Sequence, residues 1–202
     1  MSTMLRDTHR TRLLKAAQTL LRERDYADIT ARDLVAASNT NLGSIGYHFG
    51  SKEALLNEAI GLALEEWADA IGRVTLAKTG VGLPALMMST LSVVLDDYQS
   101  IQPYHRAFIE ALARSARSPE LRGQLAGHYK RQRDRIASWI VDSLGDVLEP
   151  HEAGPLASFM LATADGMLIQ SFIDADDAPS SGELASATRK AFAAARSQAK
   201  GR

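Results

Sequence analysis

Apolar residues recur along this chain at the spacing of amphipathic helices, and no segment shows a convincing strand pattern. Leu13, Ala17, Leu20 and Leu21 stand at i, i+4, i+7 and i+8, which places them on one face of a helix over residues 8–24. The same reasoning predicts further helices over residues 31–38, 42–48, 52–74, 84–99, 103–116, 119–144, 152–174 and 183–197. We therefore expect an all-α fold.

The first short helix has clear start signals. Thr30 is a good N-cap, and Asp33 stands three residues later, where an acid completes a capping box. The predicted helix over residues 31–38 should bury Leu34 and Ala37. This short helix is thus expected to pack against its longer neighbours.

A tight turn separates this helix from the next. Asn39 tolerates the left-handed backbone conformation that otherwise calls for glycine. Asn41 can then cap a second short helix over residues 42–48, which Phe49 and Gly50 end. Two short helices joined by such a turn and flanked by longer helices form the plan of a helix-turn-helix.

Glycine and proline mark other boundaries. Residues 75–83 hold two glycines and predict a loop, and residues 145–151 predict another. Pro103 suits the first turn of a helix, and Ser118 is expected to cap the helix that starts at Pro119. These signals divide the second part of the chain into long helices.

Composition narrows the class of protein. The chain has 202 residues, of which 46% are hydrophobic and 23% charged, and it has no cysteine, so disulfides and thiolate sites are excluded. No run of about 18 apolar residues occurs and the first residues lack a secretory pattern. We expect a cytoplasmic protein without a membrane span.

Charge is unevenly distributed. Residues 1–52 carry eight basic and five acidic side chains, whereas the remainder carries 15 basic and 19 acidic ones. The net charge of the whole chain is −1. A basic first quarter permits contact with DNA, and a solvated surface of uneven charge would have the same composition.

The segment from Thr30 onward carries a specific resemblance. The run Tyr47-His48-Phe49-Gly50-Ser51-Lys52-Glu53, with the helices before it, is similar to the signature of the TetR family of transcriptional regulators. The resemblance covers residues 8–60 and implies a helix-turn-helix domain at 1–52, joined to a larger helical domain at 53–202 for effector binding and dimerisation. It also implies that the chain binds double-stranded operator DNA, as a repressor that a small-molecule effector releases.

The sequence departs from the family pattern at three points. Asn39 replaces the usual turn glycine, and Gly46 stands where the family often has a large residue. Glycine costs a helix about 1 kcal/mol relative to alanine. The recognition helix also has no Lys or Arg, so bidentate reading of guanine is excluded from residues 42–48.

The resemblance assigns candidate DNA contacts by position. Asn41, Gly43 and Ser44 start the recognition helix and are expected to face the groove. At the end of this helix, we expect Tyr47 and His48 to contact phosphates or thymine methyl groups. We expect the DNA backbone to be contacted by Thr30, Arg32 and Lys52.

The helix over residues 152–174 is apolar nearly all round, so it needs partners on two sides. Small residues, Ala157, Ala164 and Gly166, would allow close approach. The family resemblance implies a homodimer through residues 152–174 and 183–197, which would set two recognition helices one DNA turn apart. A helix at the centre of a monomer is the alternative.

An effector pocket is implied by the resemblance alone. The candidate lining residues are large or flexible side chains, or single polar side chains on otherwise apolar helix faces. Residues of this kind are also common in a hydrophobic core. The candidates are Trp67, Met88, Tyr104, Phe108, His128, Trp139, Phe159, Asp165 and Gln170. Asp165 could instead pair with a base such as Arg135 or meet the dimer partner.

Other classes have little support in the sequence. The five histidines are scattered, and no metalloprotease, phosphate-loop or nucleophile-elbow motif is present, so we expect neither an enzyme nor a cofactor or metal. An all-helical binding protein or hydrolase without DNA function is the alternative. A regulator that acts through a protein partner, without a small ligand, is another.

Overall fold

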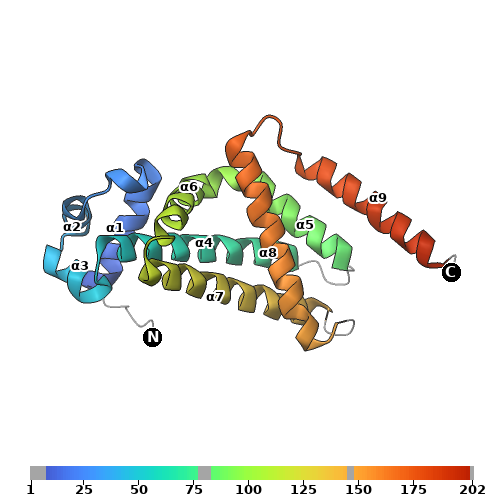
Figure 1. The fold of residues 1–202 in the computed structure, drawn as a ribbon, viewed down its shortest axis with the longest axis horizontal. Helices are drawn as coiled ribbons and strands as arrows, with labels where there is room; N and C mark the ends of the chain where they lie inside the picture. The colour runs from blue at the N-terminus through green and yellow to red at the C-terminus, as the bar shows by residue number, and fades with distance from the viewer. Residues whose placement is uncertain (1–7, 77–82, 145–147, 201–202) are drawn as a thin grey trace, which may run out of the picture. The chain divides into compact units, whose positions relative to one another are not determined.

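The structure, a computed structural model, describes residues 8–76, 83–144 and 148–200. These residues form α-helices and one short 3-10 helix, without a strand among them, which confirms the all-α prediction (Figure 1). In chain order the elements are α1 (His9–Glu23), η1 (Tyr26–Asp28), α2 (Ala31–Ser38), α3 (Leu42–Phe49), α4 (Lys52–Leu76), α5 (Leu83–Asp96), α6 (Tyr98–Ser115), α7 (Pro119–Leu144), α8 (Pro150–Ile173) and α9 (Ser181–Lys200).

Three helix starts differ from the prediction by two residues or more: those of α6, α8 and α9, the last of which begins at Ser181 and not at residue 183. Helix α6 begins at Tyr98, so Pro103 lies inside it and not in its first turn. At this boundary the Asp97 carboxylate accepts a hydrogen bond from the Ser100 hydroxyl at 2.7 Å. Helix α8 begins two residues earlier than expected because the Glu152 carboxylate accepts a hydrogen bond from the Glu149 backbone N–H at 2.9 Å. Of the loops predicted at 75–83 and 145–151, residues 77–82 and 145–147 lie outside the described residues. Residues 75–76, 83 and 150–151 belong to helices, so the predicted loops were too long at these ends.

The chain forms two compact units. One contains residues 8–66 and 103–129, and the other contains residues 67–102 and 130–200. The first unit therefore holds the predicted helix-turn-helix together with parts of α4, α6 and α7. The functional division at residue 52 remains a prediction, and the compact units are divided elsewhere.

The core of the first unit is built from the predicted apolar stripe of α1. Leu13 and Leu21 are fully buried, as are Leu34 of α2 and Leu55 of α4. The expectation that Ala37 would be buried is wrong, since Ala37 is exposed and Ser38 is buried in its place. Ser38 can be buried because its hydroxyl donates to the Leu34 carbonyl oxygen at 2.7 Å.

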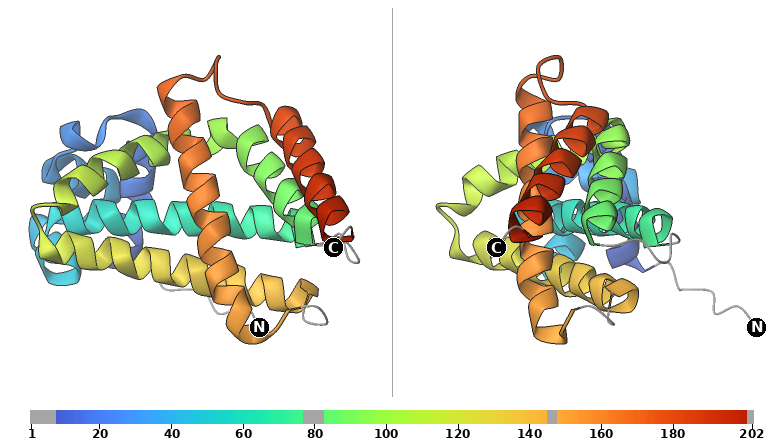
Figure 2. Two further views of the ribbon diagram at one scale, coloured as in Figure 1. Left: turned by 45° about the vertical axis from the view of Figure 1, so that its right-hand side comes forward. Right: turned by 90° about the vertical axis from the view of Figure 1, so that its right-hand side faces the viewer.

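In the second unit α5 packs along α9 and against α8 (Figure 2). A core cluster of Ile140, Ala153 and Ala157 joins α7 to α8. Ala157 is thus used within the unit and is not part of a free face of α8.

Helix α8 is also, within the described part of the chain, the one helix that is long and apolar enough to cross a membrane by length and composition. It contains Glu152 and Asp165, so the prediction that no uninterrupted run of about 18 apolar residues occurs still holds. Of its most apolar stretch, 17% is buried inside the structure. Most of this stretch is therefore not buried by the other described residues.

Candidate nucleic-acid interface

Local side-chain chemistry fixes the turn between α2 and α3. The Thr30 hydroxyl accepts from the Asp33 backbone N–H, and the Asp33 carboxylate accepts from the Thr30 N–H, as the predicted capping box requires. These Thr30 hydrogen bonds lower the pKa of Asp33. Asn39 adopts the predicted left-handed conformation with φ 48° and ψ 53°. The two short helices are thus set by their own sequence.

The first turn of α3 is held from inside the unit. The Asn41 side-chain oxygen accepts from the Ser44 backbone N–H at 3.0 Å, which confirms the predicted cap. Ser44 itself is buried, and its hydroxyl lies 2.9 Å from Nδ1 of His9 on α1. The expectation that Ser44 faces the groove is therefore wrong, because its hydroxyl is used to attach α3 to α1.

The opposite side of α3 is open. Tyr47 is 86% exposed and Leu42 is 54% exposed, and Gly43 and Gly46 are exposed with them. His48 is half-buried, and its ring meets the Tyr47 ring edge to face at 4.9 Å between centroids. Sequence reasoning missed Leu42 and His9. The exposure of Leu42 and the hydrogen bond between His9 and Ser44, which are 35 positions apart, depend on the folded structure, so local sequence patterns do not reveal them.

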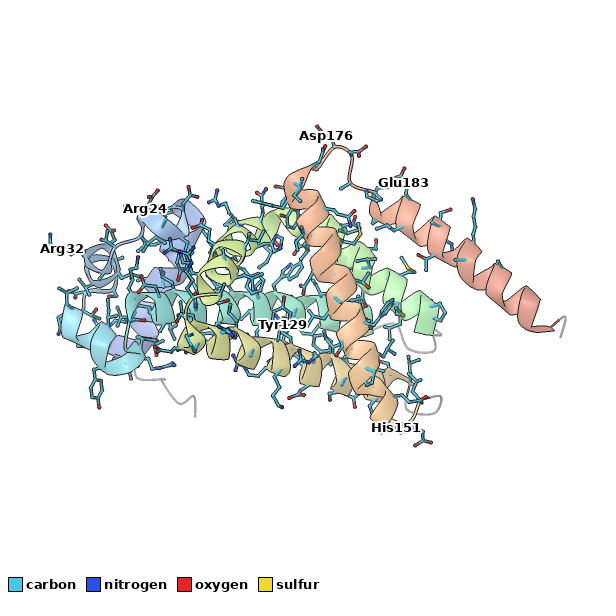
Figure 3. All side chains as sticks on the ribbon, viewed as in Figure 1. Arg24, Arg32, Tyr129, His151, Asp176 and Glu183 are labelled. Carbon is cyan, nitrogen blue, oxygen red and sulfur yellow. The ribbon has the colours of Figure 1, made fainter. Side chains whose placement is uncertain are left out.

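The residues predicted to contact the DNA backbone differ in exposure. Arg32 is exposed on the outer side of α2 (Figure 3). Lys52 is largely covered, because its ammonium group donates to the Ile29 carbonyl oxygen at 2.9 Å and lies 3.5 Å from the Glu53 carboxylate. Lys52 therefore braces the start of α4 in the DNA-free chain.

The predicted pocket residues fall in two different units. Tyr104, Phe108 and His128 lie in the first, and the other six lie in the second. The Tyr104 hydroxyl donates to the Gln18 carbonyl oxygen of α1 at 3.2 Å, so Tyr104 helps to pack α6 against the helix-turn-helix. His128 is buried, with Nδ1 at 3.0 Å from the Glu65 carboxylate. These contacts give Tyr104 and His128 structural partners within the unit.

In the second unit the Trp67 indole N–H donates to the Asp97 carboxylate at 2.7 Å, and Trp139 covers Gly72. Phe159 and Gln170 are exposed on α8, so neither lines an enclosed cavity within this unit. Met88 and Asp165 are half-buried, and Phe108 of the first unit packs near Tyr129 with ring centroids 6.0 Å apart. Effector binding by these residues remains a prediction.

No group of three or more His, Asp or Glu side chains that could hold a metal ion occurs within residues 8–76, 83–144 and 148–200. In the first unit, α3 presents an exposed side, and hydrogen bonds from capping residues fix the turn that precedes it. That arrangement is the geometry of a helix-turn-helix DNA-binding domain.

Comparison with known proteins agrees with this class. Residues 13–59 match the model of the bacterial regulatory proteins of the tetR family. This segment is similar to the DNA-binding domain of that family, and the chain shares the fold of TetR-family transcriptional regulators. No curated protein sequence is significantly similar to the chain.

Solved structures share the fold at low identity. The TetR family repressor AlkX from Dietzia sp. strain DQ12-45-1b has a TM-score of 0.67 and 17% identity, covering 95% of this chain and 96% of its own. Salmonella enterica GusR has a TM-score of 0.59 and 24% identity, covering 90% and 92%. A protein from Saccharomonospora viridis in complex with choline has a TM-score of 0.57 and 21% identity, covering 90% and 93%.

Proposed function

We propose that this protein is a cytoplasmic, non-enzymatic repressor that binds operator DNA as a homodimer through α3 and is released by a small-molecule effector. The observation that carries the DNA-binding part is the outward side of α3, presented on a turn fixed by Asn39 and Asn41. A helix held in this way can enter the major groove with its exposed side toward the bases.

The contacts to DNA follow from exposure. We assign base contacts to Asn41, Gly43 and Tyr47, and backbone contacts to Arg32 and the start of α2 at Thr30, which are all exposed. His48 and Lys52 are partly covered in the free chain. They would contact phosphate from the edge of the interface.

Selection from a random duplex library tests this assignment. The full chain should enrich a defined sequence, and its affinity for that duplex should fall with rising salt as bound cations are released from phosphates. The Arg32→Ala variant should weaken binding to all sequences and reduce the salt slope, whereas Arg122→Ala on α7 should change neither. A chain that enriches no sequence and shows no salt-dependent binding would be an all-helical protein without DNA function.

Dimerisation is supported by the free side of α8. Phe159, Ala162, Gly166, Ile169 and Ile173 follow one another at spacings of three and four residues, as in a helix–helix seam. None of them is buried, and Ile173 is 75% exposed. Small residues in the middle of this seam would let two copies of α8 approach closely. A second copy of the chain therefore suits this face.

Sedimentation equilibrium tests the dimer with two matched substitutions. Ile169 on α8 is 43% exposed and Leu112 on α6 is 49% exposed, so both start from similar surface positions. Ile169→Asp should convert the dimer to a monomer, because a carboxylate would be buried in an apolar seam. Leu112→Asp should leave the dimer intact. A wild-type monomer at micromolar concentration would refute the proposal.

Effector control is supported by the family domain and by the bound choline of the structural neighbour from Saccharomonospora viridis. A ligand that binds the native chain raises its melting temperature by mass action. A compound from a library that raises the melting temperature should also release the selected duplex. If no compound does either, the chain acts without a small ligand, through a protein partner.

A further inference from the structure

The outer side of α3 is apolar and contains two glycines. At about 3.6 residues per turn, the order around the helix is Leu42, Gly46, Gly43 and Tyr47. The two glycines thus lie between two exposed apolar side chains. We call these four residues the reading face. It continues the helix-turn-helix surface, so its occupant is duplex DNA if the proposed function is right.

Polar side chains near this face are already engaged. The Ser44 hydroxyl donates to the Asn41 side-chain oxygen at 3.3 Å and also lies 2.9 Å from Nδ1 of His9. Bidentate reading of adenine by Asn41 needs the same oxygen that now caps α3. The Asn41 oxygen already accepts from the Ser44 N–H and hydroxyl, so Asn41 can contact a base through its side-chain N–H groups while the cap stays intact.

Gly46 is not required by the fold. A Cβ atom built on Gly46 would meet nothing within 4 Å, and its backbone is ordinary helix without a positive φ. Alanine would be the better residue for the helix alone. Gly43 is different, because a Cβ there would come within 3.2 Å of the Asn41 oxygen that forms the cap. Among the described residues nothing needs the space that the missing Gly46 side chain leaves, which favours a use toward a partner molecule.

We propose that the reading face recognises thymine in the major groove, with Leu42 as a specificity-determining residue. The C5-methyl group of thymine is the apolar group that base pairs present in this groove. Leu42 and Tyr47 would pack on either side of it, and the two glycines would let the base edge come close to the helix backbone. This inference rests on the proposed function.

Deoxyuridine tests it, since this base lacks only the methyl group of thymine. Each thymine of the selected duplex is replaced singly, and affinity is measured by fluorescence anisotropy. At least one replacement should weaken binding of the wild-type chain about four-fold, the effect expected for one lost methyl contact. That effect should disappear in Leu42→Ala and persist in Leu112→Ala, an exposed leucine away from α3.

Gly46→Ala gives a second test, because it should change stability and DNA affinity in opposite directions. The variant should raise the melting temperature of the free chain and weaken operator affinity at least ten-fold. Gly123→Ala on α7 is the matched control, because Gly123 is also exposed with no atom within 4 Å of an added Cβ. It should raise the melting temperature and leave affinity unchanged.

The outcomes separate the two levels of the proposal. A chain that enriches no duplex refutes the proposed function and this inference together. A chain that binds a selected duplex, but is indifferent to every deoxyuridine or keeps full sensitivity in Leu42→Ala, overturns the thymine reading alone. Unchanged affinity of Gly46→Ala overturns the role of the glycine.

Discussion

A buried pair of polar side chains anchors the helix-turn-helix to α4. The Tyr26 hydroxyl donates to the Asn57 side-chain oxygen at 3.1 Å, and both residues are almost completely buried. The Asn57 side-chain nitrogen is buried without a hydrogen-bond partner. Tyr26→Phe would leave the Asn57 oxygen without this donor, at a cost of about 1–3 kcal/mol in the free energy of unfolding.

The free energy of unfolding of the double variant shows whether Tyr26 and Asn57 are coupled. Asn57→Leu alone should also destabilise by about 1–3 kcal/mol, because the Tyr26 hydroxyl loses its acceptor. Tyr26→Phe with Asn57→Leu removes the hydroxyl and the whole amide. It should therefore lie within about 1 kcal/mol of the wild type.

Equilibrium unfolding in urea at one fixed chain concentration measures all three variants, with exposed Tyr47→Phe as a control that should change nothing. If the losses of the two single variants simply add in the double variant, the hydrogen bond does not couple these residues and the reasoning fails.

Three further predictions follow from close contacts and from burial. Gly61→Ala would place a Cβ 1.9 Å from the His128 ring, so it should lower the free energy of unfolding by about 1–3 kcal/mol in urea unfolding, and no loss would contradict the contact. Gly72→Ala would come within 2.6 Å of Trp139, so the tryptophan emission maximum should shift, whereas an unchanged spectrum would place the indole elsewhere. Burial raises the pKa of Tyr26 from its ordinary value to about 12. The unfolded chain loses this proton first, so stability should decline as pH rises from 10 toward 12, and Tyr26→Phe should decline less.

The recognition turn was predictable because its signals are local. Thr30 with Asp33, and Asn39 with its left-handed backbone, act within three or four residues of their own position. Propensity and capping chemistry therefore identified α2, the turn and α3 without knowledge of the rest of the fold.

Long-range contacts set the features that sequence reasoning missed. Ser44 turns inward because His9 lies beside it, and Tyr104 reaches the α1 backbone across 86 positions. Such pairings are decided by packing, so local periodicity cannot select them.

DNA binding through α3 is tested most directly by one affinity measurement on the Tyr47→Ala variant. The side chain is 86% exposed, so its removal should leave the melting temperature unchanged. Fluorescence anisotropy on the selected duplex should show at least ten-fold weaker binding than the wild type. Wild-type affinity in this variant, with the same melting temperature, would contradict the assignment of α3 as the helix that contacts DNA.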